Sequence, residues 1–320
     1  MEKKQLVYQE TEKKRATALF KGKCGGKISG KVRDFALKNW TQNFWDDIRD
    51  DVISYFEEKG IKWHRYAKLG HLLSSQVCCI NYLFPIIHDK KNVLRLAKAV
   101  CADFIDVLPV DTYKDLPVFI QFEAISSKSY LNEGHQTPGS NCTSIDALIY
   151  AEHKNGSKYL IPIEWKYTEY YDNKDKSIED RRGDVRLKRY SKLITNSRYL
   201  KSLPNYRNSV YFFEPFYQLM RQTLWAEQMI QHKKDENIKA DNYIHVHIIP
   251  NENEKLLKRE KGYKVSKKPL LETWQDNLKD KEKYVIKTPM DFIKHIDHNK
   301  YSDLLNYLQK RYWNNLLIKS

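Results

Sequence analysis

The chain has 320 residues, 41% of them hydrophobic and 13% aromatic, and its 56 Lys and Arg outnumber 41 Asp and Glu to give a net charge of +15. This apolar content excludes a wholly disordered chain, because such a chain can bury a core. A protein this basic usually meets a polyanion, and nucleic acid is the first partner to consider.

Apolar segments and cysteines indicate which cellular compartment to expect for the protein. No stretch approaches the roughly 18 apolar residues of a membrane-spanning helix, and no apolar segment follows the charged start of the chain. The five cysteines are odd in number and none forms a Cys-x-x-Cys pair, which disfavours a disulfide framework and a zinc site. We expect a cytoplasmic protein with reduced thiols and no membrane contact.

The first third of the chain is expected to be helical after a basic start. Residues 1–38 are rich in lysine and contain glycines, which predicts a short helix and then a loose, partly flexible arm. Residues 39–106 have apolar side chains at helical spacing, interrupted at Gly60 and Pro85. The three expected helices cover about 39–59, 66–82 and 89–106.

The pattern then changes to strands. Residues 118–125 are a β-branched and aromatic run of strand length, and two more strands are expected over 144–152 and 158–169. Asn155-Gly156 between these two is a strong hairpin signal, so they should be antiparallel neighbours. A helix after Pro215 leads to a fourth strand, over 243–249, and this crossover allows a parallel pair.

The order of elements predicts one α/β domain. Its core runs helix, three strands, helix, strand, with a mixed sheet flanked by helices and with helical additions at both ends. We divide the chain into a basic, partly flexible arm, a helical addition, a central core, and a basic segment whose last helix packs on the core. These parts are residues 1–38, 39–88, 89–250 and 251–320.

Charged residues interrupt two of the apolar strands. Asp146 lies in the second strand, and Glu164 and Lys166 lie in the third. Since strand side chains alternate between faces, Glu164 and Lys166 leave the same face, and the hairpin brings Asp146 nearly opposite Glu164. Two carboxylates suit Mg²⁺, and the lysine would orient a water or offset developing charge. The alternative is a solvated strand face with an Asp146–Lys166 pair.

These segments resemble the PD-(D/E)XK nuclease superfamily. The resemblance rests on Thr137-Pro138-Gly139-Ser140, Ser144-Ile145-Asp146 and Ile163-Glu164-Trp165-Lys166. It implies a restriction-endonuclease-like fold over about half of the chain. It also implies that Asp146, Glu164 and the backbone carbonyl of Trp165 hold Mg²⁺, with Mn²⁺ as a substitute, and that Lys166 is the catalytic lysine.

Flanking segments extend the resemblance, and two residues depart from it. Residues 71–76 and 217–222 resemble an uncharacterised bacterial restriction-endonuclease-like subgroup. Ile145 stands where the superfamily's name has proline, and Pro162 falls inside the third strand. Because proline cannot donate to a strand ladder, we expect Pro162 at an edge, at a bulge or at a strand start.

Four more polar residues have two interpretations each. Glu123 would be a third acid of the site, or an exposed charge at the end of its strand. Gln76 would reach the site from its helix, or would be a satisfied core glutamine. His245 and His247 alternate along the fourth strand, but other zinc ligands are lacking nearby in the sequence, which favours core positions.

The helix after Pro215 has a polar side formed by Gln218, Arg221, Gln222 and Trp225. These residues would face the active site and a DNA strand, or they would form an ordinary polar face. We count Gln218 as a candidate catalytic residue and Arg221 as a candidate nucleic-acid contact.

Three stretches concentrate positive charge: residues 1–38, 172–207 and 255–268. The middle stretch directly follows the strand with Glu164, which would place it near a phosphate at the metal. A solvated face is the alternative for any single charge run. The candidate nucleic-acid contacts are Arg181, Arg182, Arg186, Lys188 and Arg189.

The combined pattern favours a Mg²⁺-dependent endonuclease that hydrolyses DNA phosphodiesters, in restriction or genome defence. Fold does not settle the substrate, so repair, junction-resolving and RNA-cutting nucleases stay open. A non-catalytic nucleic-acid-binding protein on a nuclease fold is the alternative from another class. A homodimer would suit double-strand cleavage.

Overall fold

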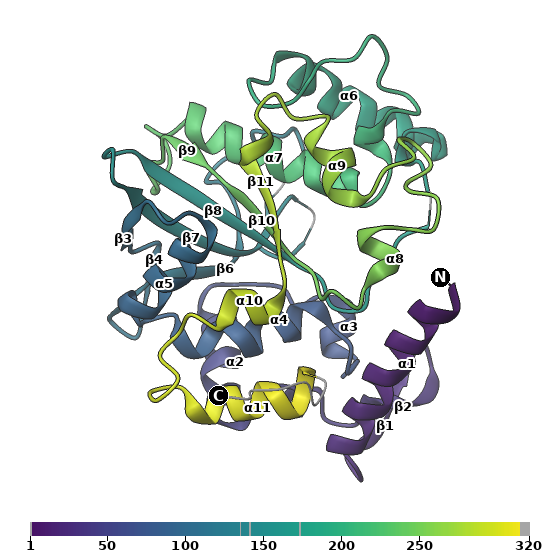
Figure 1. Cartoon of the computed structure of the whole chain (residues 1–320), viewed down its shortest axis with the longest axis vertical. Coiled ribbons are helices and arrows are strands. Elements are labelled where there is room, and N and C mark those ends of the chain that lie inside the picture. The colour runs from purple at the N-terminus through teal and green to yellow at the C-terminus, as the bar shows by residue number, and fades with distance from the viewer. Residues whose placement is uncertain (1, 135, 141, 173, 314–320) are drawn as a thin grey trace.

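The computed structural model describes residues 2–134, 136–140, 142–172 and 174–313. A seven-stranded mixed sheet lies at the centre of the molecule, with helices packed on both faces (Figure 1). The predicted α/β class, with a mixed sheet flanked by helices, is confirmed.

The central sheet is built from strands far apart in the sequence. They are β3 (Phe104–Leu108), β6 (Ile120–Ala124), β7 (Ile145–His153), β8 (Lys158–Trp165), β9 (Asn242–Tyr243), β10 (His245–Ile248) and β11 (Tyr284–Lys287). The order is β11-β10-β8-β7-β3, and β6 and β9 pair additionally with β7 and β8. β10 runs parallel to β8, an arrangement that the crossover between them allows. β3 and β6 take different halves of β7.

Helices and two small hairpins surround the sheet. The helices are α1 (Glu2–Leu19), α2 (Arg49–Glu58), α3 (Arg65–Lys68), α4 (Ser75–Leu83), α5 (Lys90–Val100), α6 (Asp180–Asn196), α7 (Phe216–Gln231), α8 (Glu254–Leu257), α9 (Leu270–Gln275), α10 (Pro289–Ile293) and α11 (Ser302–Tyr312). The hairpins pair β1 (Cys24–Ile28) with β2 (Lys31–Leu37) and β4 (Asp111–Tyr113) with β5 (Leu116–Val118).

Both faces of the sheet are buried. Ala147 and Ile149 of β7 pack into the core shared with α2, α4 and α5. Leu148 and Tyr150, on the opposite face, pack into the core shared with α6, α7 and α9. A strand covered on both sides needs apolar residues at nearly every position, so an acid such as Asp146 stands out.

The β7–β8 hairpin forms as predicted. Gly156 takes a positive φ of 81°, which the tight turn requires. The N–H of Gly156 donates to the carbonyl of His153 at 2.8 Å, and His153 N–H donates to Ser157 O at 2.9 Å. The resulting antiparallel register pairs Ala147 with Ile163, so both acidic positions fall at the end of the hairpin that lies away from the turn.

Pro162 corrects the prediction of an edge, bulge or strand-start position. It lies inside β8, a central strand, opposite Leu148 of β7. On the other side of β8, pairing with β9 ends at Leu160 and pairing with β10 begins at Ile163. The missing N–H of Pro162 therefore falls in this interruption of the ladder, next to the bond that Ile244 N–H donates to Leu160 O at 3.0 Å.

Two of the expected helices are shorter than predicted. Residues 40–43 and 46–48 are 3-10 turns, and a regular helix begins only at Arg49. Trp40 and Phe44 still pack on the core. Their spacing in the sequence therefore indicated correctly that they contact the core, but not how long the helix is. The second expected helix is split into α3 and α4 around Gly70, which has a positive φ of 67°.

Secondary structure was also missed. Residues 104–108 form β3 and pair with the end of β7, although residues 104–106 were placed at the end of a helix over 89–106. The basic stretch 172–207, given no element, contains the 17-residue helix α6. β11, near the C-terminus, extends the sheet beyond β10. A short apolar run fits strand and helix alike, and the choice for β3 depended on a partner strand distant in sequence.

The N-terminal arm is more regular than expected. The short helix is an 18-residue helix, α1, and the supposed loose segment is the β1–β2 hairpin. That hairpin is attached to the body of the protein, because Leu37 N–H donates to Gly70 O at 2.9 Å and Leu72 N–H donates to Phe35 O at 3.0 Å. The division of the chain into four parts stays a prediction.

Within the described part of the chain, every helix is too short or too polar to cross a lipid bilayer.

Candidate active site

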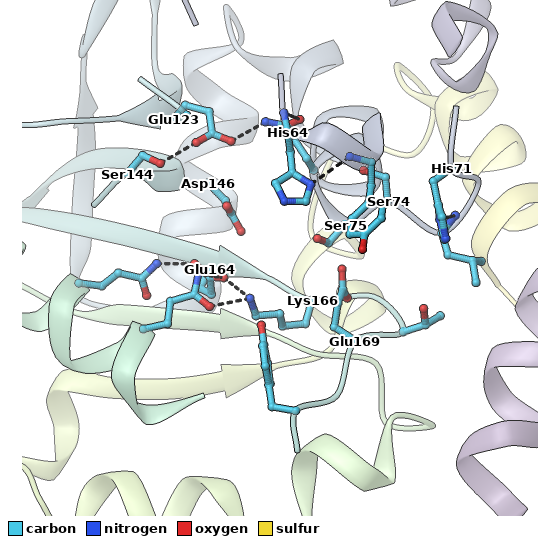
Figure 2. Close-up of a pocket in the computed structure, with 18 of the residues that line it drawn as sticks. His64, His71, Ser74, Ser75, Glu123, Ser144, Asp146, Glu164, Lys166 and Glu169 are labelled. Carbon is cyan, nitrogen blue, oxygen red and sulfur yellow. Dashed lines mark hydrogen bonds and ion pairs between the residues drawn. The ribbon is translucent and has the colours of Figure 1, made fainter. Parts of the chain in front are cut away.

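Three carboxylates lie side by side on neighbouring strands. The β7–β8 register, fixed by Ala147 opposite Ile163, sets Asp146 opposite Glu164. The β6–β7 register sets Glu123 opposite Asp146. Figure 2 shows the three side chains in a row across the end of the sheet. The predicted juxtaposition of Asp146 and Glu164 is therefore present in the fold.

Asp146 connects the two central strands beyond the end of their ladder. Its Oδ2 accepts a hydrogen bond from the backbone N–H of Trp165 at 2.8 Å. The N–H and C=O of a strand residue point to the same side, so the carbonyl of Trp165 is also directed toward β7. The half-buried Asp146 lines a cavity, and Figure 2 shows its carboxylate directed toward Glu164.

Glu164 is held by a network that includes two glutamines of α7. Lys166 Nζ donates to Glu164 Oε1 and, at 2.9 Å, to Gln218 Oε1. Gln218 Nε2 donates to the same Glu164 oxygen at 2.7 Å, while Gln222 Nε2 donates to Oε2. Gln218 and Gln222 are one helical turn apart and reach the site together. The buried Glu164 carboxylate is thus fixed in direction by three neighbours.

Glu123 is held in an unusual backbone conformation. Its φ is +48°, a left-handed value that costs a non-glycine residue about 1–3 kcal/mol and is concentrated at functional positions. The carboxylate accepts from Gln76 Nε2 at 2.6 Å and from Ser144 Oγ at 2.8 Å. Gln76 in turn accepts from the N–H of His64 at 3.0 Å. Glu123 and Gln76 therefore belong to the site, and Glu123 is not an exposed strand end.

Three carboxyl groups and one ammonium group lie close together in the site, where burial and neighbouring charges shift the pKa values of Asp146, Glu123 and Lys166. Burial raises the pKa of Asp146 well above its ordinary value, and the neighbouring Glu164 and Glu123 carboxylates raise it further. Burial also raises the pKa of Glu123. Burial alone would lower the pKa of Lys166, but its acidic neighbours, Glu164 first, outweigh burial and raise it. Lys166 therefore stays an ammonium beside the three acids.

The acids open into a cavity of about 520 Å³. One wall consists of the α3–α4 region with His64 and His71, another of α7, and a third of the segment after β8 with Glu169. Burial lowers the pKa of His64, and burial together with Lys13 lowers that of His71 to about 4. Both imidazoles are therefore uncharged at neutral pH.

The helix α1 closes one side of this cavity. Gln9 Nε2 donates to the carbonyl of Thr168 at 2.7 Å, and the hydroxyl of Tyr167 donates to Glu12. Gln9 itself lines the cavity. The start of the chain is thus part of the site, and no spacing pattern in the sequence signalled it.

Arg221 also lines the cavity, but its guanidinium is engaged. Its Nε donates to Glu133 Oε1 at 3.2 Å and to Thr143 Oγ1 at 3.0 Å. Its guanidinium carbon lies 5.4 Å from the centre of the Tyr217 ring. Arg221 therefore shapes the cavity wall, and its assignment as a nucleic-acid contact stays a prediction.

Trp225 and the two strand histidines lie away from the cavity. Trp225 is buried in the core between α7 and the sheet. His245 and His247 are buried as well, and His247 Nδ1 is 2.8 Å from the hydroxyl of Tyr284. Burial lowers the pKa of His245 to about 3. Core positions, the favoured interpretation of both histidines, fit these surroundings.

The five basic residues predicted to bind nucleic acid belong to helix α6. Arg181, Arg182 and Lys188 are exposed, and Arg189 is half-buried. Arg186 is engaged, because it donates to Glu179 at 2.7 Å and to a backbone carbonyl at 2.9 Å. None of the five lines the cavity, and their assignment as nucleic-acid contacts stays a prediction.

The donor set fits a hard divalent cation. Asp146 and Glu164 supply carboxylate oxygens, the ligands that Mg²⁺ prefers, and Glu123 lies beside them in the cavity. The Trp165 carbonyl is expected on the same side as the Trp165 N–H, which donates to Asp146. Burial, and then repulsion from Glu164 and Glu123, raises the pKa of Asp146, and a divalent ion would relieve this repulsion. The cavity leaves room for water and a phosphate group beside the acids.

Comparison with known proteins identifies a family for the chain. The chain matches the family model described as Restriction Endonuclease associating with ARP over residues 6–313. The chain therefore belongs to this family of restriction endonucleases. No curated protein and no solved structure matches the chain.

Proposed function

We propose that this protein is a Mg²⁺-dependent endonuclease of the PD-(D/E)XK type that hydrolyses DNA phosphodiester bonds in restriction or genome defence. The observation that carries the proposal is the row of Glu123, Asp146 and Glu164 with Lys166 on the same face, at the bottom of a cavity. Membership in a restriction-endonuclease family supports it.

Asp146, Glu164 and the carbonyl of Trp165 would hold the ion. When bound, Mg²⁺ would polarise a phosphoryl oxygen and lower the pKa of a coordinated water. Glu123 is held by Gln76 and Ser144, so it would accept a hydrogen bond from water and not contact the ion directly. The phosphate would enter from the open side of the cavity.

Lys166 supplies the positive charge of the site. Its ammonium is buried between Glu164 and Gln218, close enough to the acids to meet an attacking water or the charge that grows on the phosphate oxygens. Gln218 and Gln222 would not contact the ion themselves. They fix the orientation of Glu164 and Lys166, as residues that hydrogen-bond to metal ligands usually do. We assign them as positioning residues.

Purified protein incubated with supercoiled plasmid, with Mg²⁺ and then with EDTA, tests the proposal. Nicked or linear plasmid with Mg²⁺ alone is the expected result, and Mn²⁺ should support the same cleavage. Matched incubations with single-stranded DNA and with RNA decide the substrate. Protein that binds plasmid but leaves it intact with both ions would favour a non-catalytic DNA-binding protein instead.

A further inference from the structure

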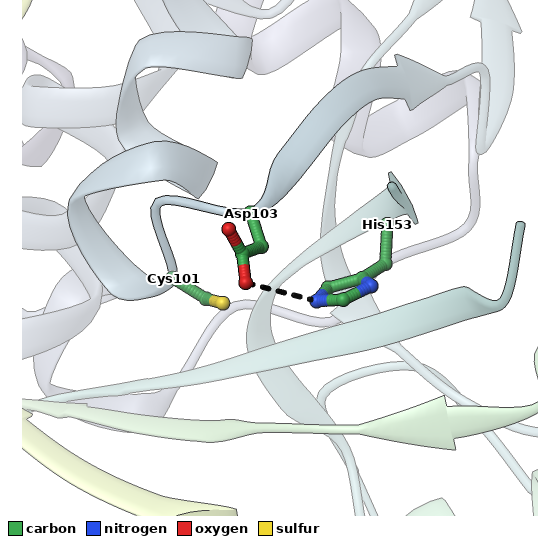
Figure 3. Close-up of side chains that lie close together, drawn as sticks. All are labelled: Cys101, Asp103 and His153. Carbon is green, nitrogen blue, oxygen red and sulfur yellow. Dashed lines mark ion pairs between the residues drawn. The ribbon is translucent and has the colours of Figure 1, made fainter. Parts of the chain in front are cut away.

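A second cluster of metal-ligating side chains lies at the other end of the β7–β8 hairpin. Cys101, Asp103 and His153 each offer one donor atom, and these atoms lie within 4.8 Å of one another. Figure 3 shows the Cys101 sulfur and the His153 imidazole on either side of the Asp103 carboxylate. The cluster lies outside the residues that line the active-site cavity.

The backbone brings these residues together without help from a ligand. Cys101 directly follows α5, and Asp103 lies in the turn before β3. His153 ends β7 and pairs with Phe104 of β3, and Lys154 N–H donates to the carbonyl of Asp103 at 3.0 Å. The two segments are therefore held in register by main-chain contacts.

The two oxygens of Asp103 have different neighbours. Oδ1 accepts an ion pair from Lys154 Nζ at 2.9 Å, while Oδ2 faces His153 Nε2 at 3.8 Å. That second separation is too long for a hydrogen bond. It is close to the roughly 3.4 Å that separates two tetrahedral ligands when each bond to zinc is about 2.1 Å.

We propose that Cys101 Sγ, Asp103 Oδ2 and His153 Nε2 bind a Zn²⁺ ion, with a water as the fourth ligand. Thiolate and imidazole select zinc-like ions over Mg²⁺, which prefers oxygen. The thiolate and carboxylate charges balance the ion, and the Cys101 proton passes to solvent on binding. The site joins the α5–β3 turn to the β7–β8 hairpin, and it is independent of the proposed cleavage chemistry.

Zinc binding requires two small changes among neighbouring surface residues. His153 Nδ1 accepts a long hydrogen bond from Asn155 N–H, at 3.3 Å, and ligation through Nε2 places the ring proton on Nδ1, so this bond is given up. Asn155 is exposed, and water can take its N–H instead. Lys154 is exposed as well, and its ammonium can withdraw as the ion arrives.

Cobalt titration of the metal-free full-length protein under reducing conditions tests the site, because a thiolate bound to Co²⁺ gives a sulfur-to-metal absorption band. Wild type should develop this band, and added Zn²⁺ should abolish it. Cys101→Ser should lack the band, whereas Cys24→Ser, which alters another partly exposed thiol, should keep it. Asp103→Asn and His153→Gln should weaken Co²⁺ binding more than about tenfold.

Two results would overturn the zinc site. Wild type without a sulfur-to-cobalt band has no thiolate-bound metal, and a band that persists in Cys101→Ser places the metal on another cysteine. Asp103→Asn changes an exposed carboxylate and is expected to fold, so it decides the question if Cys101→Ser does not fold. Asp146→Asn should keep the band, which separates this site from the carboxylates in the cavity.

Discussion

At the end of β8, Glu164 and its neighbour Asp146 lie in a cavity walled by helices. At the turn end of the same hairpin, His153 meets Asp103 and Cys101 beside exposed loops. The first group has oxygen donors, of which Glu164 accepts hydrogen bonds from Lys166, Gln218 and Gln222 and Asp146 accepts one from Trp165 N–H. The second mixes sulfur, nitrogen and oxygen and has few contacts.

The two proposed metal sites therefore differ in how their negative charges are held before an ion binds. In the cavity, like charges are forced together, and the pKa of Asp146 is raised by burial and by its acidic neighbours; such strain is common where a fold serves catalysis. At the turn, Lys154 already neutralises Asp103, and the hydrogen bond from Lys154 lowers the pKa of that carboxyl. The first site should serve chemistry, and the second should serve stability.

The largest effect is expected from the acids in the cavity. Asp146→Asn and Glu164→Gln should lower Mg²⁺-dependent cleavage by at least about 10³-fold, because each keeps the side-chain shape but removes a charge that holds the ion. Metal-free Asp146→Asn should unfold at a temperature no lower than wild type, since one of the neighbouring negative charges is gone. Plasmid cleavage and thermal unfolding in EDTA measure both.

Glu152→Gln is the matched control for these variants, because Glu152 lies on β7 near the turn, opposite Lys158. It should cut like wild type. Wild-type cleavage rates in Asp146→Asn and Glu164→Gln would show that the assigned cavity is not the active site.

Lys166→Ala should come next in size. Cleavage should fall by about 10²–10³-fold, because the buried ammonium would no longer act on the water or on the developing charge. Mg²⁺ binding, measured by calorimetry, should remain, since the carboxylates stay in place. Lys158→Ala, at the other end of β8, should be without effect. Loss of Mg²⁺ binding in Lys166→Ala would mean that the lysine holds the acids and not the substrate.

Helix α6 is expected to act on affinity and not on chemistry. Replacing Arg181, Arg182 and Lys188 by alanine should weaken DNA binding and reduce its salt slope by up to about 2.7, because each phosphate contact adds about 0.9. Filter binding over a range of salt concentrations measures the slope. An unchanged slope would move the nucleic-acid footprint to another basic surface, such as the β1–β2 hairpin.

Arg186→Gln provides the contrast within α6. The hydrogen bond from Arg186, with help from two lysines, lowers the pKa of Glu179 to about 2, so the variant should lose stability and keep most of the slope. Because the folded pKa is depressed, the stabilisation by this pair is present above about pH 4.5 and is lost as the pH falls toward 2. Unfolding temperatures of variant and wild type should therefore converge on acidification.

The smallest effects belong to the turn end of the hairpin. Cys101→Ser should leave Mg²⁺-dependent cleavage unchanged, because the cluster is outside the cavity. Lys154→Met should tighten Zn²⁺ binding a few-fold, roughly the 0.2–1 kcal/mol of an exposed ion pair, since Asp103 loses its competing cation. Cleavage that falls together with the Cys101 thiol would mean that the two ends of the hairpin are coupled.

The sequence by itself determined the centre of this site. The period of two along a strand put Glu164 and Lys166 on one face, and the Asn155-Gly156 turn made their strand the neighbour of the one with Asp146. Both rules are local: a turn and a pleat are set by residues a few positions apart. The position of three of the motif residues therefore needed no tertiary information.

Only the tertiary structure decided what surrounds that centre. Glu123 lies in the row because of the register in which β6 pairs with β7. Glu123 also takes a positive φ, which residue propensities do not predict. The sequence left two interpretations open for Gln218 and Gln222, and the packing of α7 against β8 decided that both donate to Glu164. The spacing rules for zinc ligands did not find the cluster at the turn, because the pairing of β3 with β7 brings Cys101 and His153 together. A contact between such distant segments produces no periodic pattern in the sequence.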